Sequence, residues 1–312
     1  MRYERQELLI GQEGQQKLQQ SAVAIIGIGA LGTVATELLA RSGIGTLILI
    51  DRDVIELSNL QRQTLFDEAD VGRSKAVVAK EKIAQINLDV KVKTHAIHLN
   101  SENISVIKEA NIILDCTDNM NTRFLINDFC RKNKIIWIYG AAIKTYGYAM
   151  PIFPEGPCLQ CFTENASLET CDTVGVINMA TTSIAALQSS LAVKILLQEK
   201  VEPSLYHYDV WNQEFKKLYI KQKEKCPTCN KMYVFLDQKE NDEIKTVKFC
   251  GSGRYHVSGN INFEEVKTRI KGTCDGETIQ TDKFLLFKDG RALIKANSEE
   301  EAISIYSRYI GN

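Results

Sequence analysis

Residues 21–51 read SAVAIIGIGALGTVATELLARSGIGTLILID and place a glycine-rich loop between two short apolar runs. The runs at 21–26 and 46–50 have the length and composition of buried strands. The loop Gly27-Ile-Gly29-Ala-Leu-Gly32 precedes a predicted helix over 33–42. Its glycines permit a tight turn and let backbone N–H groups approach phosphate oxygens at a helix N-terminus. The segment therefore predicts the start of a Rossmann-like, nucleotide-binding fold.

Asp51 ends the second run, 19 residues after Gly32. An acidic residue at this spacing is placed to accept a hydrogen bond from a ribose hydroxyl. The loop and Asp51 do not separate NAD from ATP. A Rossmann-like turn that binds no phosphate also fits them.

The alternation of strands and helices continues to residue 139. We expect helices at 74–85, 102–109 and 121–132, and strands at 90–94, 111–116 and 135–139. Strands that alternate with helices of this length indicate an α/β fold with a doubly wound, mostly parallel sheet. The segments near 146–153 and 206–221 are expected to form alternating strands that add an antiparallel portion to the sheet.

A polar segment, 237–244, reads as a linker between two domains of unequal size. Residues 1–236 form the expected nucleotide-binding domain, and 245–312 form a small α+β unit. In that unit we expect strands at 246–250 and 255–258 and a helix at 263–270. Asp289-Gly290 predicts a hairpin turn within 284–295, and Ser298 predicts the cap of a last helix.

The composition excludes several classes of protein. The net charge of −1 gives no basic excess for nucleic acid or an anionic membrane. Nine cysteines, an odd number, indicate thiols in a reducing cytoplasm, and the charged residues at 1–7 predict no secretory signal. The apolar stretch 177–197 contains several polar residues, so we expect a buried or half-buried helix there and no membrane span.

Two cysteine pairs lie 64 residues apart, Cys158-Leu-Gln-Cys161 and Cys226-Pro-Thr-Cys229. Four thiolates at this spacing fit one tetrahedral zinc ion and leave no open position for water, so the predicted site is structural. Two unrelated turns, or a redox pair, are the alternatives. Neither pair lies at the start of a helix after a strand, as a thioredoxin-type pair does.

Charged and amide side chains follow the second strand and can converge over the nucleotide pocket. A triphosphate that is attacked at one phosphorus needs cations to balance the charge that moves to pyrophosphate, whereas a dinucleotide needs few. A solvated charged loop is the alternative for each residue taken alone. The residues are Asp53, Asn59, Arg62, Gln63 and Lys75.

Several motifs in one order resemble the ubiquitin-activating-enzyme superfamily. They are Arg2-Tyr3-x-Arg5-Gln6, the glycine loop, SNLQRQ at 58–63, Gly72-x-x-Lys75, LDCTDN at 114–119, GAAI at 140–143 and the cysteine pairs. Within the superfamily the chain resembles the bacterial activators of sulfur-carrier proteins, of the MoeB/ThiF/HesA type. The resemblance runs from residue 2 to Cys229.

The resemblance implies an ATP-binding adenylyltransferase domain that activates a ubiquitin-like sulfur carrier with a Gly-Gly tail. The carrier's terminal carboxylate attacks the α-phosphate of ATP and releases pyrophosphate. By position, Gly27, Gly29, Gly32 and Asp51 hold adenosine and phosphates. Four residues contact the triphosphate: Asn59, Arg62, Gln63 and Lys75. Asp118 ligates magnesium with Asn119 beside it, and Arg5 reaches the γ-phosphate in the neighbouring subunit of a homodimer.

This chemistry suits the residues, because a carboxylate is already a nucleophile near neutral pH and needs no catalytic base. The protein then has to position the carboxylate and the α-phosphate and to neutralise the charge between these two anions. The resemblance also matches Cys171 to a cysteine proposed to take part in sulfur transfer in the thiamine branch. Whether Cys171 carries sulfur or is a bystander stays open here.

The segment after Cys229 does not resemble a rhodanese domain, so we expect a separate sulfur donor such as a cysteine desulfurase. For 245–312, carrier docking, dimer support and plain stabilisation stay open. Three other functions also stay open: an NAD-dependent oxidoreductase, a tRNA-modifying dehydratase of the same superfamily, and a scaffold without turnover. The sequence does not name the carrier or separate thiamine from molybdopterin biosynthesis.

Overall fold

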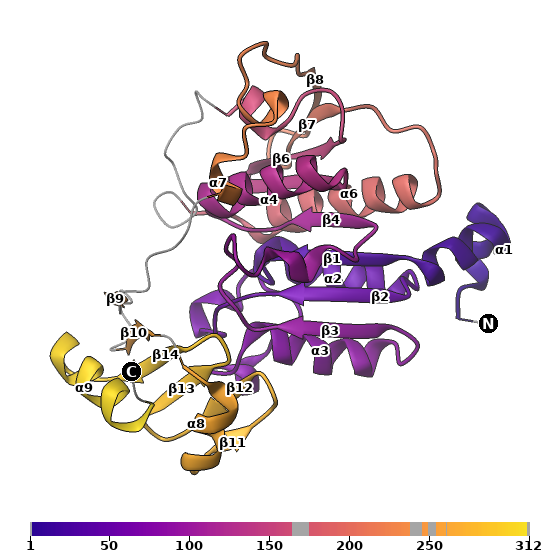
Figure 1. Cartoon of the computed structure of the whole chain (residues 1–312). Coiled ribbons are helices and arrows are strands. Elements are labelled where there is room, and N and C mark those ends of the chain that lie inside the picture. The colour runs from indigo at the N-terminus through magenta and orange to yellow at the C-terminus, as the bar shows by residue number, and fades with distance from the viewer. Residues whose placement is uncertain (1, 164–174, 238–244, 249–253, 260, 311–312) are drawn as a thin grey trace. The chain divides into compact units, whose positions relative to one another are not determined.

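The computed structural model describes residues 2–163, 175–237, 245–248, 254–259 and 261–310 (Figure 1). It divides into two compact units. The first comprises Met1–Thr94 and Leu99–Lys239, and the second comprises His95–His98 and Glu240–Asn312. Cys171 and most of the predicted linker, 238–244, lie outside the described residues.

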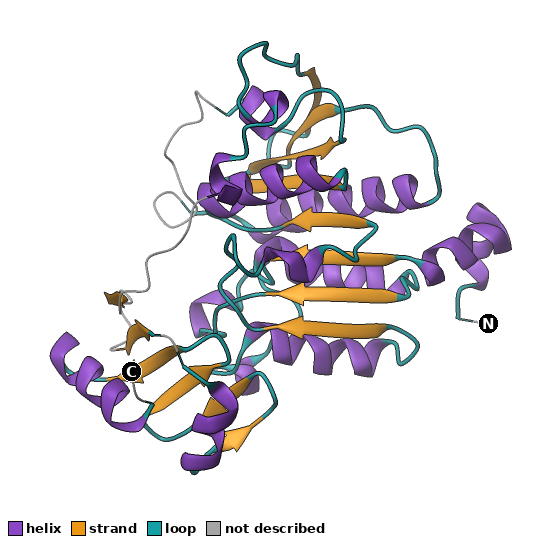
Figure 2. Ribbon diagram, viewed as in Figure 1, coloured by secondary structure: helices purple, strands orange, loops and turns teal. Residues whose placement is uncertain are grey.

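An eight-stranded sheet forms the centre of the first unit, in the order β3-β2-β1-β4-β5-β6-β7-β8 (Figures 1 and 2). Parallel pairing joins β1 to β2, β1 to β4 and β4 to β5, whereas β5 through β8 pair antiparallel. The predicted mixed, doubly wound sheet is therefore confirmed. The strands are β1 (Ala22–Ile26), β2 (Thr46–Ile50), β3 (Lys91–His95), β4 (Ile112–Asp115), β5 (Ile136–Ile143), β6 (Tyr146–Ile152), β7 (Ser204–Asp209) and β8 (Glu214–Tyr219).

Burial along the strands follows their place in the sheet. All four residues of β4 are buried, and so are the last four of β1 and β2. Strands covered on both faces carry continuous apolar runs, which is why these segments were predictable. In β8, at the edge of the sheet, every residue is exposed.

The sheet is accompanied by the helices α2 (Ala30–Arg41), α3 (Lys75–Ile86), α4 (Met120–Asn133) and α6 (Asn178–Leu196). Among the described residues α6 alone is long and apolar enough to cross a membrane. It packs against α2, β5 and β6, and its polar residues Gln188 and Ser189 are buried. It is therefore a core helix of this unit, as the sequence predicted.

Two local expectations differ from the structure. Residues 102–109 form only a 3-10 turn, Ile104–Ile107, because the side chains of Asn100 and Asn103 each accept a hydrogen bond from the other's backbone N–H. Such local bonds compete with helix formation. The helix α1 (Glu4–Gln20) was not predicted, since it is polar and is interrupted at Gly11, which has φ +73°.

The described residues of the second unit form a six-stranded antiparallel sheet in the order β11-β12-β13-β14-β10-β9, with two helices. The predicted turn at Asp289-Gly290 joins β13 to β14, and Ser298 accepts a hydrogen bond from the Glu301 N–H at the start of α9. The elements are β9 (Lys245–Lys248), β10 (Arg254–Ser258), α8 (Phe263–Arg269), β11 (Thr273–Cys274), β12 (Thr278–Gln280), β13 (Phe284–Phe287), β14 (Arg291–Lys295) and α9 (Glu299–Tyr309).

Tyr306 links α9 to the β13–β14 turn and makes the stability of this unit sensitive to alkaline pH. Its hydroxyl is buried and donates to the Gly290 carbonyl, and burial raises the pKa of Tyr306 to about 12. Above about pH 10 the unfolded chain loses this proton while the folded chain keeps it, so the free energy of unfolding should fall as pH rises.

We expect Tyr306→Phe to remove this part of the fall between about pH 10 and 12 in urea-unfolding measurements, and to lower stability by about 1 kcal/mol at neutral pH. Tyr219→Phe is the control, because Tyr219 is exposed. An unchanged slope in Tyr306→Phe would contradict this assignment.

Candidate active site and metal centre

The glycine loop is tightly constrained by its neighbours. Gly27 has φ +88°, and a Cβ atom there would lie 2.8 Å from the Cys116 carbonyl oxygen. A Cβ on Gly32 would lie 1.9 Å from the Gly27 carbonyl oxygen. Gly29 caps the N-terminus of α2 without a side-chain hydrogen bond. The first N–H groups of a helix without such a cap favour an anion, so the loop has the geometry of a phosphate site.

Asp51, Asp53 and Lys75 meet at the carboxyl end of β2. Asp51 is buried and accepts hydrogen bonds from the Ile28 N–H (2.6 Å) and the Asp53 N–H (2.7 Å). Burial raises the pKa of Asp51, and the charge of Lys75 opposes that shift. Lys75 begins α3, is 7% exposed, and places its Nζ 3.8 Å from an Asp53 carboxylate oxygen. The structure therefore brings one buried cation to the strand end that carries Asp51.

The segment after β2 positions the predicted amide and arginine side chains. Asn59 ends a 3-10 turn (Leu57–Asn59) and accepts a hydrogen bond from the Glu56 N–H. Arg62 is half-buried and donates to the Ser58 carbonyl. Gln63 is 3% exposed, and its amide group lies beside Gly29 in the glycine loop. Its Oε1 is buried and has no hydrogen-bond partner among the described residues.

Asp118 lies in the turn between β4 and α4 and is exposed. Its charge contributes to raising the pKa of the buried Asp115, although burial itself is the largest cause. Asn119 caps α4 by accepting a hydrogen bond from the Thr122 N–H (2.9 Å). An exposed carboxylate at the carboxyl end of a parallel strand is placed to bind a hydrated divalent cation together with phosphates.

Arg5 lies on α1 and is exposed, with no hydrogen bond or ion pair to another residue in the described ranges. Its neighbours Leu8 and Leu9 are 83% and 87% exposed. The structure does not pair Arg5 with the other predicted site residues in the same chain.

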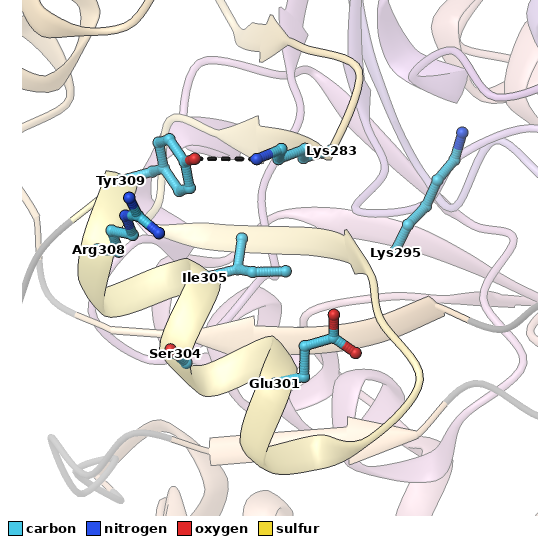
Figure 3. A pocket seen from close by; sticks show the side chains of 7 residues that line it. All are labelled: Lys283, Lys295, Glu301, Ser304, Ile305, Arg308 and Tyr309. Carbon is cyan, nitrogen blue, oxygen red and sulfur yellow. Dashed lines mark hydrogen bonds between the residues drawn. The ribbon is translucent and has the colours of Figure 1, made fainter.

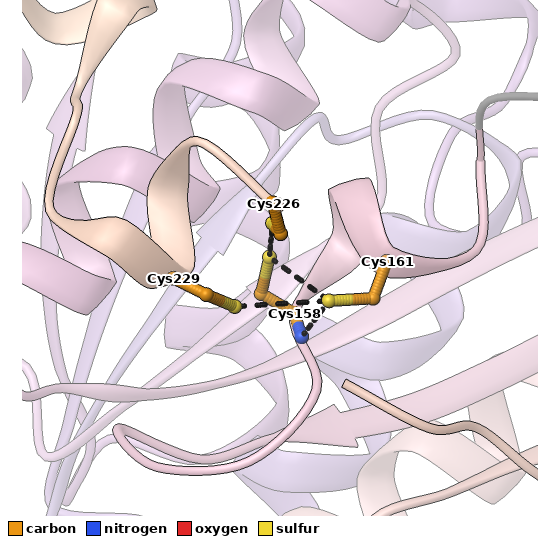
Figure 4. Close-up of side chains that lie close together, drawn as sticks. All are labelled: Cys158, Cys161, Cys226 and Cys229. Carbon is orange, nitrogen blue, oxygen red and sulfur yellow. Dashed lines mark hydrogen bonds between the residues drawn. The ribbon is translucent and has the colours of Figure 1, made fainter. Parts of the chain in front are cut away.

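The two cysteine pairs come together in one cluster, although they are far apart in the sequence (Figure 4). All four sulfur atoms lie within 4.8 Å of one another. Cys158 Sγ is 3.4 Å from Cys226 Sγ, and Cys161 Sγ is 3.7 Å from Cys229 Sγ. In a tetrahedral zinc site with Zn–S bonds of about 2.3 Å, sulfur atoms lie about 3.8 Å apart. The residues therefore fit one zinc ion.

The thiols of the cluster already interact. A hydrogen bond with the Cys158 thiol lowers the pKa of Cys161 to about 4, and the same bond raises the pKa of Cys158. Burial raises the pKa of Cys229 to about 12. Since zinc binds thiolates, metal binding requires the cluster to release protons and is favoured by higher pH.

Sequence reasoning missed a set of buried polar residues that hold the strand ends. Arg123 donates to the carbonyls of Thr117 and Gly140, and its Nε lies 3.3 Å from an Asp115 carboxylate oxygen. Gln188, from α6, donates to the carbonyls of Asp115 and Ile138. A glutamine in an apolar helix was the available signal, but its partners depend on the folded arrangement.

A small cleft lies in the second unit, with a volume of about 270 Å³ (Figure 3). Lys283 donates to the Tyr309 hydroxyl beside it. The charged side chains that line it are exposed, which is typical of a solvated surface. The lining residues are Lys283, Lys295, Glu301, Ser304, Ile305, Arg308 and Tyr309.

Comparisons with known proteins show which family the chain belongs to. Residues 3–228 match the ThiF family. The chain is 36% identical to the sulfur carrier protein ThiS adenylyltransferase of Bacillus subtilis (strain 168), over 99% of both chains. It is 38% identical to the enzyme of the same name from Escherichia coli (strain K12), over 73% of this chain and 94% of the relative.

Among solved structures, the chain resembles E. coli MccB crystallised with AMPCPP and selenomethionyl MccA. The TM-score is 0.65 with 25% identity, over 73% of this chain and 74% of that one. The family match covers well over half of the chain, and the match to the B. subtilis protein extends through the second unit. The chain belongs to the ThiF family.

Proposed function

We propose that this protein uses ATP to adenylate the C-terminal glycine carboxylate of a ubiquitin-like sulfur carrier of the ThiS type. An oxygen of the carboxylate attacks the α-phosphorus, the bond from that phosphorus to the bridging β-phosphate oxygen breaks, and pyrophosphate leaves. The observation that carries the proposal is the meeting of the glycine loop, Asp51 and Lys75 at the β1 and β2 ends, in a chain similar over its whole length to a ThiS adenylyltransferase.

The described side chains can perform this reaction without a general base. The glycine loop and the start of α2 bind phosphate oxygens through backbone N–H groups. Lys75 and Arg62 balance the charge that builds up on pyrophosphate as it departs. Asp51 accepts from the ribose. The nucleotide analogue present with MccB, AMPCPP, supports ATP as the nucleotide.

Asp118 is the residue that would hold a magnesium ion here, with Asn119 beside it. Magnesium favours carboxylate oxygens and retained waters, and an exposed carboxylate offers both. When bound, the ion neutralises charge on the phosphates. Arg123 pairs with Asp115, which leaves Asp118 as the exposed acid of this turn.

Zinc is proposed as a structural ion held by Cys158, Cys161, Cys226 and Cys229. The sulfur separations support one tetrahedral ion with no position for substrate. None of the seven described cysteines forms a disulfide, which supports a reducing cytoplasm. The proposal also includes a separate protein that donates the sulfur. Cys171, which lies outside the described residues, remains a candidate for taking part in sulfur transfer.

Carrier-dependent exchange of labelled pyrophosphate into ATP tests the function. Wild-type protein should exchange label only when a carrier ending in Gly-Gly is present, and a carrier that lacks its last glycine should not support exchange. Mg-ATP should raise the melting temperature and NAD should not. Stabilisation by NAD without exchange would favour the oxidoreductase. Carrier binding without exchange would favour the scaffold.

We also propose a homodimer in which Arg5 acts in the partner's site, because Arg5 is exposed and unpaired within its own described chain. Arg5→Ala and Asp118→Ala homodimers should each be nearly inactive. Each mixed dimer should regain about one half of wild-type exchange, since one of its two sites is intact, and a statistical mixture of the two variants should regain about one quarter. Native mass spectrometry verifies mixing, and verified mixed dimers without activity would refute the shared site.

A further inference from the structure

We propose that Asn127 and Asp128 are positioning residues, which couple the four-cysteine cluster to the turn that carries Asp118 through helix α4. The inference rests on the proposed function, because Asp118 matters only if phosphates bind near it. The two residues are consecutive in α4, and each contacts a different cysteine pair.

Asn127 holds the first cysteine pair. Its Oδ1 accepts a hydrogen bond from the Leu159 N–H at 3.0 Å, and Leu159 lies between Cys158 and Cys161. Asn127 is 1% exposed. Its contact is therefore made in the interior of the first unit, where loss of a hydrogen-bond partner is costly.

Asp128 holds the second pair and the segment after it. One carboxylate oxygen accepts from the hydroxyl of Thr228, which lies between Cys226 and Cys229, at 2.5 Å. The other accepts from the Phe235 N–H at 3.0 Å, and the rings of Phe124 and Phe235 stack with centroids 4.8 Å apart. Asp128 is fully buried. One turn of α4 thus binds the middle of both cysteine pairs.

The other end of α4 is held as firmly. Asn119 caps the helix, and Arg123 ties its first turn to the Thr117 and Gly140 carbonyls. From residue 120 to residue 128 helix α4 rises about 12 Å, and we treat this short helix as a stiff element. Movement at the cysteine end is therefore transmitted to the turn at Asp118.

Coupling of this kind is reciprocal. If zinc favours the position of α4 that binds Mg-ATP, then Mg-ATP must favour zinc retention by the same factor. A purely structural role for Asp128 would lower stability without linking the two ligands. This difference separates positioning from stabilisation.

The first measurement is amide hydrogen exchange of the full chain by mass spectrometry. We compare zinc-loaded wild type, wild type stripped by a chelator, and zinc-loaded Asp128→Asn. Exchange in 117–126 should become at least tenfold faster in the last two, whereas exchange in 22–26 and 46–50 should change less than twofold. Asp237→Asn is the matched control, because Asp237 also lies beside α4 but its side chain is 70% exposed. Thr228→Val replaces Asp128→Asn if the latter does not fold.

The second measurement is the rate of zinc release to a chelator, with and without Mg-ATP. In wild type, Mg-ATP should slow release severalfold, and zinc should tighten Mg-ATP binding. Both effects should vanish in Asp128→Asn.

Unchanged exchange in 117–126 after zinc removal, equal acceleration in all three segments, or purified protein without zinc would each overturn the coupling. If pyrophosphate exchange is normal but amide hydrogen exchange at 117–126 does not change when zinc is removed, this inference alone is refuted. If amide hydrogen exchange at 117–126 becomes faster on zinc removal but the protein shows no pyrophosphate exchange, the proposed function is refuted and the physical coupling stands.

Discussion

Asp118→Ala should lower carrier-dependent pyrophosphate exchange by roughly 100- to 1,000-fold, the range seen when one charge-stabilising group of an active site is removed. Asp118 is the exposed carboxylate in the turn between β4 and α4. Without it, the ion that neutralises the phosphates loses its protein ligand, and two anions must approach each other with less compensation. The measurement is the initial rate of label exchange at saturating carrier and Mg-ATP.

The fold should survive this substitution. An exposed residue outside a packed or capped position changes stability by about 0.5 kcal/mol or less. Asp89→Ala is the matched control, since its carboxylate is 76% exposed and lies after α3, before β3. Exchange at the wild-type rate in Asp118→Ala would refute the magnesium role and the site as proposed.

Cys226→Ser should release zinc and lower the melting temperature by at least about 10 °C. Structural zinc sites contribute about 10–16 kcal/mol in small domains, and each kcal/mol corresponds to about 2–4 °C in a domain of this size. The cluster joins two distant segments, and both are buried against α4. Their release therefore exposes interior polar groups together with the thiols.

Metal analysis and thermal unfolding check this expectation. Cys274→Ser is the control, because Cys274 is a half-buried cysteine of the second unit outside the cluster. One zinc per chain in Cys226→Ser, or an unchanged melting temperature, would contradict a shared four-cysteine site.

The sequence predicts the central sheet well, since β1, β2 and β4 consist mostly of continuous apolar runs, and such runs are recognisable without tertiary information. The glycine loop and Asp51 are predictable for the same reason, because their spacing is local. The α1 helix could not be predicted, because its sequence is polar and Gly11 interrupts it with a kink. At 102–109 a full helix does not form, because asparagine side chains accept hydrogen bonds from backbone N–H groups just before and within this segment.

The candidate site is only partly visible in the sequence. Lys75 stands out beside Gly72, but its burial next to Asp51 depends on how α3 packs. Asn127 and Asp128 resemble ordinary polar helix residues. Their importance arises because the fold brings the two cysteine pairs to consecutive residues of α4. Contacts between such distant segments do not follow from local pattern.

The most direct test of the account follows the phosphates of ATP. ATP labelled at the α-phosphate, and separately at the γ-phosphate, is incubated with wild-type protein and a carrier ending in Gly-Gly. The account predicts α-label on the carrier and γ-label in pyrophosphate. Transfer of γ-label to the carrier with release of ADP, or no label on a carrier that binds, would contradict it.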